Sequence, residues 1–148
     1  FVKPFGENLR AKLTESDLAM LQAGQAAHDP NLELKAKWPG YFYDRDRALA
    51  TRSGADGAFG QDGVGKFAMP SYFANSETMI LALKGAGSVP VILIKGKQDP
   101  IDESVATSIA TVLPQTEIKL IDECGHLPWL ERPKQADEFY GLLHRALE

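Results

Sequence analysis

The chain has 148 residues, of which 44% are hydrophobic and 24% are charged, and its formal net charge is −4. This length and composition are typical of one globular domain with enough apolar residues to form a core. The acidic balance and the lack of a Lys/Arg run argue against nucleic acid or an anionic membrane as the main partner, so we expect a small-molecule or protein ligand.

Cys124 is the only cysteine, so no disulfide can form within the chain, and we expect a reducing compartment, with the cytoplasm favoured. No apolar run approaches the roughly 20 residues of a membrane span, and no signal peptide is recognisable. The chain starts at Phe1 and not at a methionine. We therefore expect a truncated or processed product, for which the absence of a signal decides little.

The first 85 residues have the pattern of short helices. Residues 14–17 (TESD) resemble a capping box with Asp in place of Glu, and they predict a helix that runs to about His28 and ends before an Asp-Pro pair. Residues 30–50 predict short helical pieces, and the Gly-rich, polar stretch 53–65 predicts a mobile loop. A further helix is predicted over 70–85, with proline at its first position and glycine at its end.

The second part of the chain alternates strands and helices. The apolar, β-branched run 89–94 is typical of a strand buried on both faces, followed by a helix over 101–113 and a second strand over 117–121. A helix over 133–147 closes the chain, and its pattern predicts that it turns inward Phe139, Leu142, Leu143 and Leu147. The crossover helix makes the two strands parallel, so the fold class is α/β and both strands end at the same edge of the sheet.

Two residues that could carry out acid–base chemistry follow these strands. Asp99 lies in the turn after the first strand, and His126 lies in the loop after the second. In such a pair the carboxylate accepts the Nδ1 proton of the imidazole, which leaves Nε2 free to take a proton from a nucleophile. Taken singly, each residue is more often a turn or loop-packing residue.

The stretches GKQDPI (96–101) and CGHLPWLERP (124–133) together resemble the C-terminal half of the α/β-hydrolases, which include proline iminopeptidases, esterases, epoxide hydrolases and haloalkane dehalogenases. In that family the acid lies in a G-x-x-D turn and the histidine in a G-H-x-P-x-x-E-x-P stretch. The matching residues here are Gly96, Asp99, Gly125, His126, Pro128, Glu131 and Pro133. The resemblance implies that Asp99 is the acid of a catalytic triad, that His126 is its general base, and that no cofactor is needed.

The resemblance also divides the chain into a helical cap (1–87) and the C-terminal part of the hydrolase core (88–148). Caps of this family shape the substrate pocket and exclude water. An apolar pocket would then be lined by aromatic residues of the cap, although at helical spacing aromatic residues are more often plain core. These residues are Trp38, Tyr41, Phe42, Tyr72 and Phe73, with Tyr43 beside them.

The nucleophile of the family is missing, because none of the seven serines lies in a G-x-S-x-G elbow. We therefore expect the chain to be inactive alone. We expect a fragment of a hydrolase, and the alternatives are one chain of a two-chain enzyme or a domain that kept the sheet only for binding. Because two strands leave sheet edges unpaired, we expect self-association or a partner, such as the N-terminal half of a hydrolase.

The substrate class is a small ester or amide, and two alternatives stay open. One is an aminopeptidase similar to proline iminopeptidases, which AMPSYFANSE (68–77) faintly resembles. The place of that family's amine-binding acid holds Met69-Pro70-Ser71, so the remaining candidates are Glu33, Asp44 and Glu77. The other alternative is a non-enzymatic interaction module in which Asp99 and His126 share a structural hydrogen bond. The three scattered histidines predict no metal site.

Overall fold

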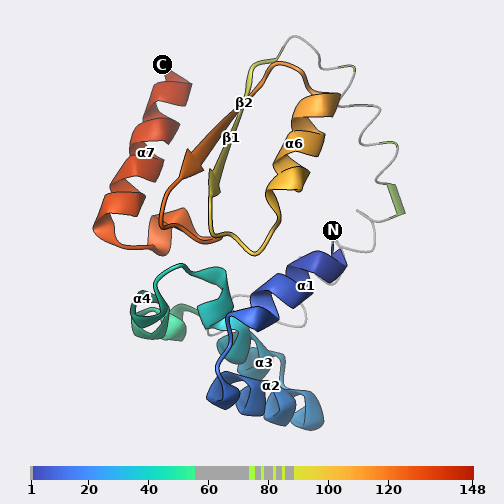
Figure 1. Ribbon diagram of the computed structural model, residues 1–148, viewed down its shortest axis with the longest axis vertical. Coiled ribbons are helices and arrows are strands. Elements are labelled where there is room, and N and C mark those ends of the chain that lie inside the picture. Colours follow the sequence, from blue (N-terminus) through green and yellow to red (C-terminus); the bar gives the residue numbers. More distant parts are fainter. Residues whose placement is uncertain (1, 56–73, 76–77, 79–81, 83–84, 86–88) are drawn as a thin grey trace.

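The computed structural model describes residues 2–55, 74, 75, 78, 82, 85 and 89–148. Of the predicted helix over 70–85, the structure describes 74, 75, 78, 82 and 85, all of which are helical, and most of the predicted loop over 53–65 lies outside the described ranges. Helices α1 to α4 gather at one end of the molecule, and the sheet with α6 and α7 forms the other end (Figure 1).

The N-terminal half is helical, as the sequence predicts. Its elements are α1 (Val2–Ala11), α2 (Glu15–Ala27), α3 (Pro30–Lys37), the 3₁₀ turn η1 (Trp38–Tyr41), α4 (Arg45–Ala50) and the 3₁₀ turn η2 (Arg52–Ala55).

The predicted capping box is confirmed at the start of α2. The side chain of Thr14 accepts the backbone N–H of Asp17, and the Asp17 carboxylate accepts the backbone N–H of Thr14. The helix ends at His28, which adopts a left-handed conformation with φ of 53° and donates its N–H to two carbonyls of the last turn. Asp29 then caps α3, whose first residue is proline.

The sheet of the C-terminal half has two parallel strands, β1 (Val91–Gly96) and β2 (Thr116–Ile121), connected by α6 (Glu103–Val112). The 3₁₀ turn η3 (Pro128–Leu130) and α7 (Pro133–Leu147) follow. Figure 1 shows α6 and α7 on opposite sides of the sheet. The predicted α/β class and the parallel pairing are therefore confirmed. The first strand begins two residues later than predicted because its pairing starts at Val91, and Val89 is 55% exposed.

The burial predicted for these elements is wrong in part. Ile92, predicted to lie in a strand buried on both faces, is 39% exposed. Leu143 and Leu147 of α7, predicted to face inward, are 39% and 79% exposed. The reason is geometric: the two strands that the structure describes offer too little surface to cover both a complete apolar strand and a fifteen-residue helix.

One hydrophobic cluster joins the two halves. Its buried members, Leu34, Trp38, Phe42 and Ala48, come from the helical half, and Leu127 and Leu130 from the loop after β2 pack against them. The loop that carries His126 is thus fixed by apolar contacts to the helical half.

Candidate active site

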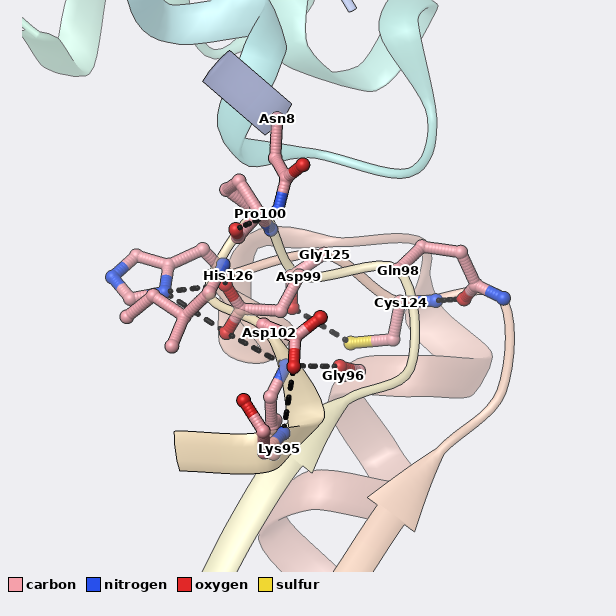
Figure 2. Close-up of polar contacts among 12 residues, drawn as sticks. Asn8, Lys95, Gly96, Gln98, Asp99, Pro100, Asp102, Cys124, Gly125 and His126 are labelled. Atoms are coloured by element: carbon pink, nitrogen blue, oxygen red, sulfur yellow. Dashed lines mark hydrogen bonds and ion pairs between the residues drawn. The ribbon is translucent and has the colours of Figure 1, made fainter. Parts of the chain in front are cut away.

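The structure brings Asp99 and His126 together at the carboxyl ends of the two strands. Nδ1 of His126 lies 3.0 Å from Oδ2 and 3.2 Å from Oδ1 of Asp99 (Figure 2). The two residues are 27 positions apart in sequence, and α6 and β2 lie between them. This is the edge of a parallel sheet at which ligands bind in open α/β folds.

The two loops fit closely because glycines stand where they touch. A Cβ at Gly96 would lie 2.1 Å from the carbonyl oxygen of Gly125, so the backbones approach at a distance that no side chain allows. The backbone N–H of Gln98 donates to the Cys124 carbonyl at 2.9 Å, and the N–H of Cys124 donates to Oε1 of Gln98 at 3.0 Å. These reciprocal bonds hold the turn that carries Asp99 (the acid turn) against the loop that carries His126 (the base loop).

Asp99 is held as a carboxylate. Its side chain is 8% exposed, and its Oδ1 accepts the backbone N–H of Ile101 at 2.7 Å. Burial raises the pKa of Asp99, but the hydrogen bonds from His126 and the Ile101 amide outweigh this cost and lower the pKa below its ordinary value. A buried, ionised carboxylate can fix the imidazole tautomer with the proton on Nδ1.

His126 is fixed on one side and open on the other. Its backbone N–H donates to the Tyr41 carbonyl at 2.6 Å, and its ring centroid lies 5.7 Å from that of Tyr41 and 6.3 Å from that of Phe5. The side chain is 34% exposed, and Figure 2 shows one ring nitrogen directed away from Asp99. No described residue forms a hydrogen bond with Nε2.

The sequence singled out Glu131 by motif only, and the structure gives it a role. The carboxylate is 1% exposed and accepts the backbone N–H groups of Gly125 at 2.8 Å, Tyr43 at 2.7 Å and Asp44 at 3.4 Å. It therefore ties the base loop to the helical half. The sequence signal was the fixed spacing from His126, which did not reveal these distant partners.

Helix α1 also contacts the acid turn. Asn8 donates to the Pro100 carbonyl at 3.0 Å, and the ammonium of Lys12 donates to the carbonyls of Gln98 and Phe42. Burial lowers the pKa of Lys12, and the nearby carboxylates of Asp99 and Glu131 oppose that shift. No sequence pattern predicted these contacts.

The predicted aromatic pocket is not assembled as such by the described residues. Trp38 and Phe42 are 6% and 2% exposed and belong to the hydrophobic cluster, which is the plain-core alternative that the sequence left open. Tyr41 is half-buried beside His126, and Tyr43 is 47% exposed. Tyr72 and Phe73 lie outside the described residues.

Two of the three candidate amine ligands are already engaged. Glu33 pairs with Lys37 at 3.1 Å beside a shallow cavity of about 220 Å³ that Tyr41 also lines. Asp44 caps α4 and pairs with Arg132. Glu77 lies outside the described residues. Neither Glu33 nor Asp44 is a free carboxylate beside His126.

The part of the chain that the structure describes shows neither a metal-binding cluster nor a membrane-spanning helix. It contains no cluster of His, Cys, Asp and Glu side chains that could hold a metal ion, and no helix with the length and apolarity of a membrane span. Comparison with known proteins found no matching family model, no matching curated protein and no matching solved structure.

Proposed function

We propose that Asp99 and His126 are the acid and base of a serine-type α/β-hydrolase that cleaves a small ester or amide by acyl transfer to water. The observation that carries this proposal is the bond between the Asp99 carboxylate and Nδ1 of His126, while Nε2 forms no hydrogen bond with the described residues. The resemblance of residues 96–101 and 124–133 to α/β-hydrolase motifs supports it, since these two residues are the ones that the motifs mark.

The pair would act on a hydroxyl nucleophile from outside this chain. Nε2 of His126 takes the hydroxyl proton as the oxygen attacks the substrate carbonyl, and then gives that proton to the leaving group. Asp99 stabilises the imidazolium formed between these steps. Water repeats the sequence on the acyl intermediate and releases the acid product. The described serines lie on α2, η2 and α6, and the His126 ring forms its hydrogen bonds with Asp99 and with none of these serines.

A partner polypeptide follows from the same proposal. The described sheet has two strands, and Ile92 remains exposed on it. Unpaired strand edges and exposed apolar side chains favour association with a further polypeptide, which would bring the nucleophile. Analytical ultracentrifugation at micromolar concentration tests this part: association is expected, and a strict monomer contradicts it.

The function of the pair is tested by NMR titration of the His126 ring in the wild-type chain and in Asp99→Asn. Loss of a carboxylate 3.0 Å away is expected to move the midpoint down by about one pH unit, because the imidazolium loses its partner. Asp102→Asn is the matched control, since Asp102 is exposed and caps α6, a role that Asn also fills. An unchanged midpoint in Asp99→Asn favours the interaction module and contradicts the hydrolase.

The nucleophile is tested on the material as isolated, with a fluorophosphonate probe and a denaturing intact-mass spectrum. We expect the label on a serine of an accompanying polypeptide, and hydrolysis of 4-nitrophenyl butyrate that His126→Ala abolishes. A verified preparation of this chain alone that shows His126-dependent turnover would overturn the missing-nucleophile proposal.

A further inference from the structure

Lys95 is a buried charged residue at the end of β1 that the proposed mechanism does not use. Its side chain is 7% exposed, and its ammonium nitrogen lies 3.7 Å from Oδ2 of Asp99. The same nitrogen donates to the Gly96 carbonyl at 3.2 Å (Figure 2). A buried ammonium group is costly unless it is paired, so this position requires Asp99 to be a carboxylate.

The oxygen of Asp99 that faces Lys95 also faces His126. Oδ2 lies 3.0 Å from Nδ1 of His126 and 3.7 Å from Nζ of Lys95, so the two nitrogens are within about 6.7 Å of each other. The carboxylate thus divides its charge between an ammonium group and an imidazole. Two positive charges at this separation repel, so Lys95 opposes protonation of the ring.

The surroundings of Lys95 strengthen this effect. A cavity of about 180 Å³ beside Lys95 and Asp99 is lined mainly by apolar side chains of β1 and α6, such as Leu93, Val105 and Ile109. Charges next to apolar walls are screened less than charges at an open surface. The cavity also has room for a longer cationic side chain at this position.

Charged and titratable groups from every neighbouring element act on the same cluster. The acid turn and α6 contribute Asp99 and Asp102, α1 contributes Lys12, and the chain after β2 contributes Cys124, His126 and Glu131. Lys95 differs from Lys12 in its direct approach to the carboxylate oxygen that binds the imidazole.

We propose that Lys95 is a positioning residue of the acid–base pair, which holds the Asp99 carboxylate in place and favours the unprotonated, proton-accepting form of His126. This inference rests on the proposed function, because a general base must be unprotonated when its nucleophile arrives. Lys95 itself is not placed at the reacting atoms.

The test is an NMR titration of the Asp99 carboxyl carbon and the His126 ring in the 148-residue chain. In Lys95→Met, which keeps an apolar stem of similar length, both midpoints are expected to rise by about 0.5 to 1 pH unit. Lys95→Arg restores the cation and is expected to return both midpoints toward the wild-type values. Lys97→Met is the matched control, because Lys97 is 43% exposed and pairs with Asp122, so it should move neither midpoint.

Lys95→Gln is the second variant if Lys95→Met does not fold, and the same upward movement is expected because it also lacks the charge. A role in folding alone would lower the melting temperature and leave both midpoints unchanged, which overturns the inference. The outcome is separable from that of the proposed function. If Asp99→Asn moves the His126 midpoint and neither neutral Lys95 variant does, the result supports the acid–base pair and contradicts the positioning role of Lys95.

Discussion

Glu131 accepts the backbone N–H of Gly125, the residue before the candidate base, at 2.8 Å. The same oxygen accepts the N–H of Tyr43 at 2.7 Å, and the second oxygen accepts the N–H of Asp44. One buried carboxylate thus connects the His126 loop to a segment more than 80 residues earlier in the chain.

The first prediction concerns this carboxylate. In Glu131→Gln one carboxylate oxygen is replaced by an NH₂ group, so at least one of the three N–H groups loses its acceptor, and the remaining oxygen is a weaker, neutral acceptor. The free energy of unfolding is expected to fall by about 1–3 kcal/mol, as measured by urea denaturation. Glu138→Gln on the exposed side of α7 is the control and should change stability by less than about 0.5 kcal/mol. Equal effects in both variants would contradict the role of Glu131.

The second prediction concerns the close approach at Gly125. A Cβ at this position would lie 2.3 Å from the Tyr41 carbonyl oxygen and 2.7 Å from Cα of Phe42, so Gly125→Ala must separate the base loop from the helical half. We expect a loss of about 1–3 kcal/mol in thermal unfolding. In Gly141→Ala the added methyl group meets only the end of Arg145, at 3.6 Å. That control should stabilise α7 by about 0.5–1 kcal/mol, and a neutral Gly125→Ala would show that the loop does not need this fit.

The third prediction is a pH dependence of stability that centres on Asp17. Its carboxylate is buried and lies 2.7 Å from Arg45 and 2.9 Å from Arg52. Burial raises the pKa of Asp17, but the hydrogen bonds from Arg45 and Thr14 outweigh it, so the pKa lies well below its ordinary value. A group with a lowered folded pKa stabilises fully above the unfolded value, about 3.9, and this contribution is lost as the pH falls further.

The free energy of unfolding of Asp17→Asn should therefore be about 1–3 kcal/mol lower than that of the wild type at pH 7, and this difference should be smaller at pH 3. Chemical denaturation at both pH values measures this. Asp137→Asn on α7 controls for the loss of an exposed carboxylate. A difference that stays constant between pH 7 and pH 3 would mean that the ion pairs of Asp17 contribute nothing.

The fourth prediction concerns Cys124, which is completely buried. Burial, with the neighbouring carboxylates of Glu131 and Asp99, raises the pKa of the thiol to about 12. Because the thiolate is the reactive form, the native chain should not react with 5,5′-dithiobis(2-nitrobenzoate) until it is denatured. Ser53→Cys places a thiol at an exposed position and should react at once, which shows that the reagent is active. Rapid labelling of Cys124 in the folded chain would contradict the buried position.

The sequence by itself determined the local elements and the order in which they occur. The capping box at Thr14, the end of α2 near His28 and the β–α–β pattern each depend on residues close together in the chain, so local rules find them. Parallel pairing then followed from the crossover helix. It placed Asp99 and His126 at one sheet edge, where the structure finds them 3.0 Å apart.

Only the tertiary structure decided how these elements use their side chains. Glu131 and Asp17 are charged residues that a local pattern assigns to the surface, and each is buried against partners from distant segments of the chain. Trp38 and Phe42 became core in the same way, whereas Leu147 of α7 became exposed because a two-stranded sheet cannot cover it. Burial depends on which distant segments meet, and contacts between residues 35 to 90 positions apart leave no periodic signal in the sequence.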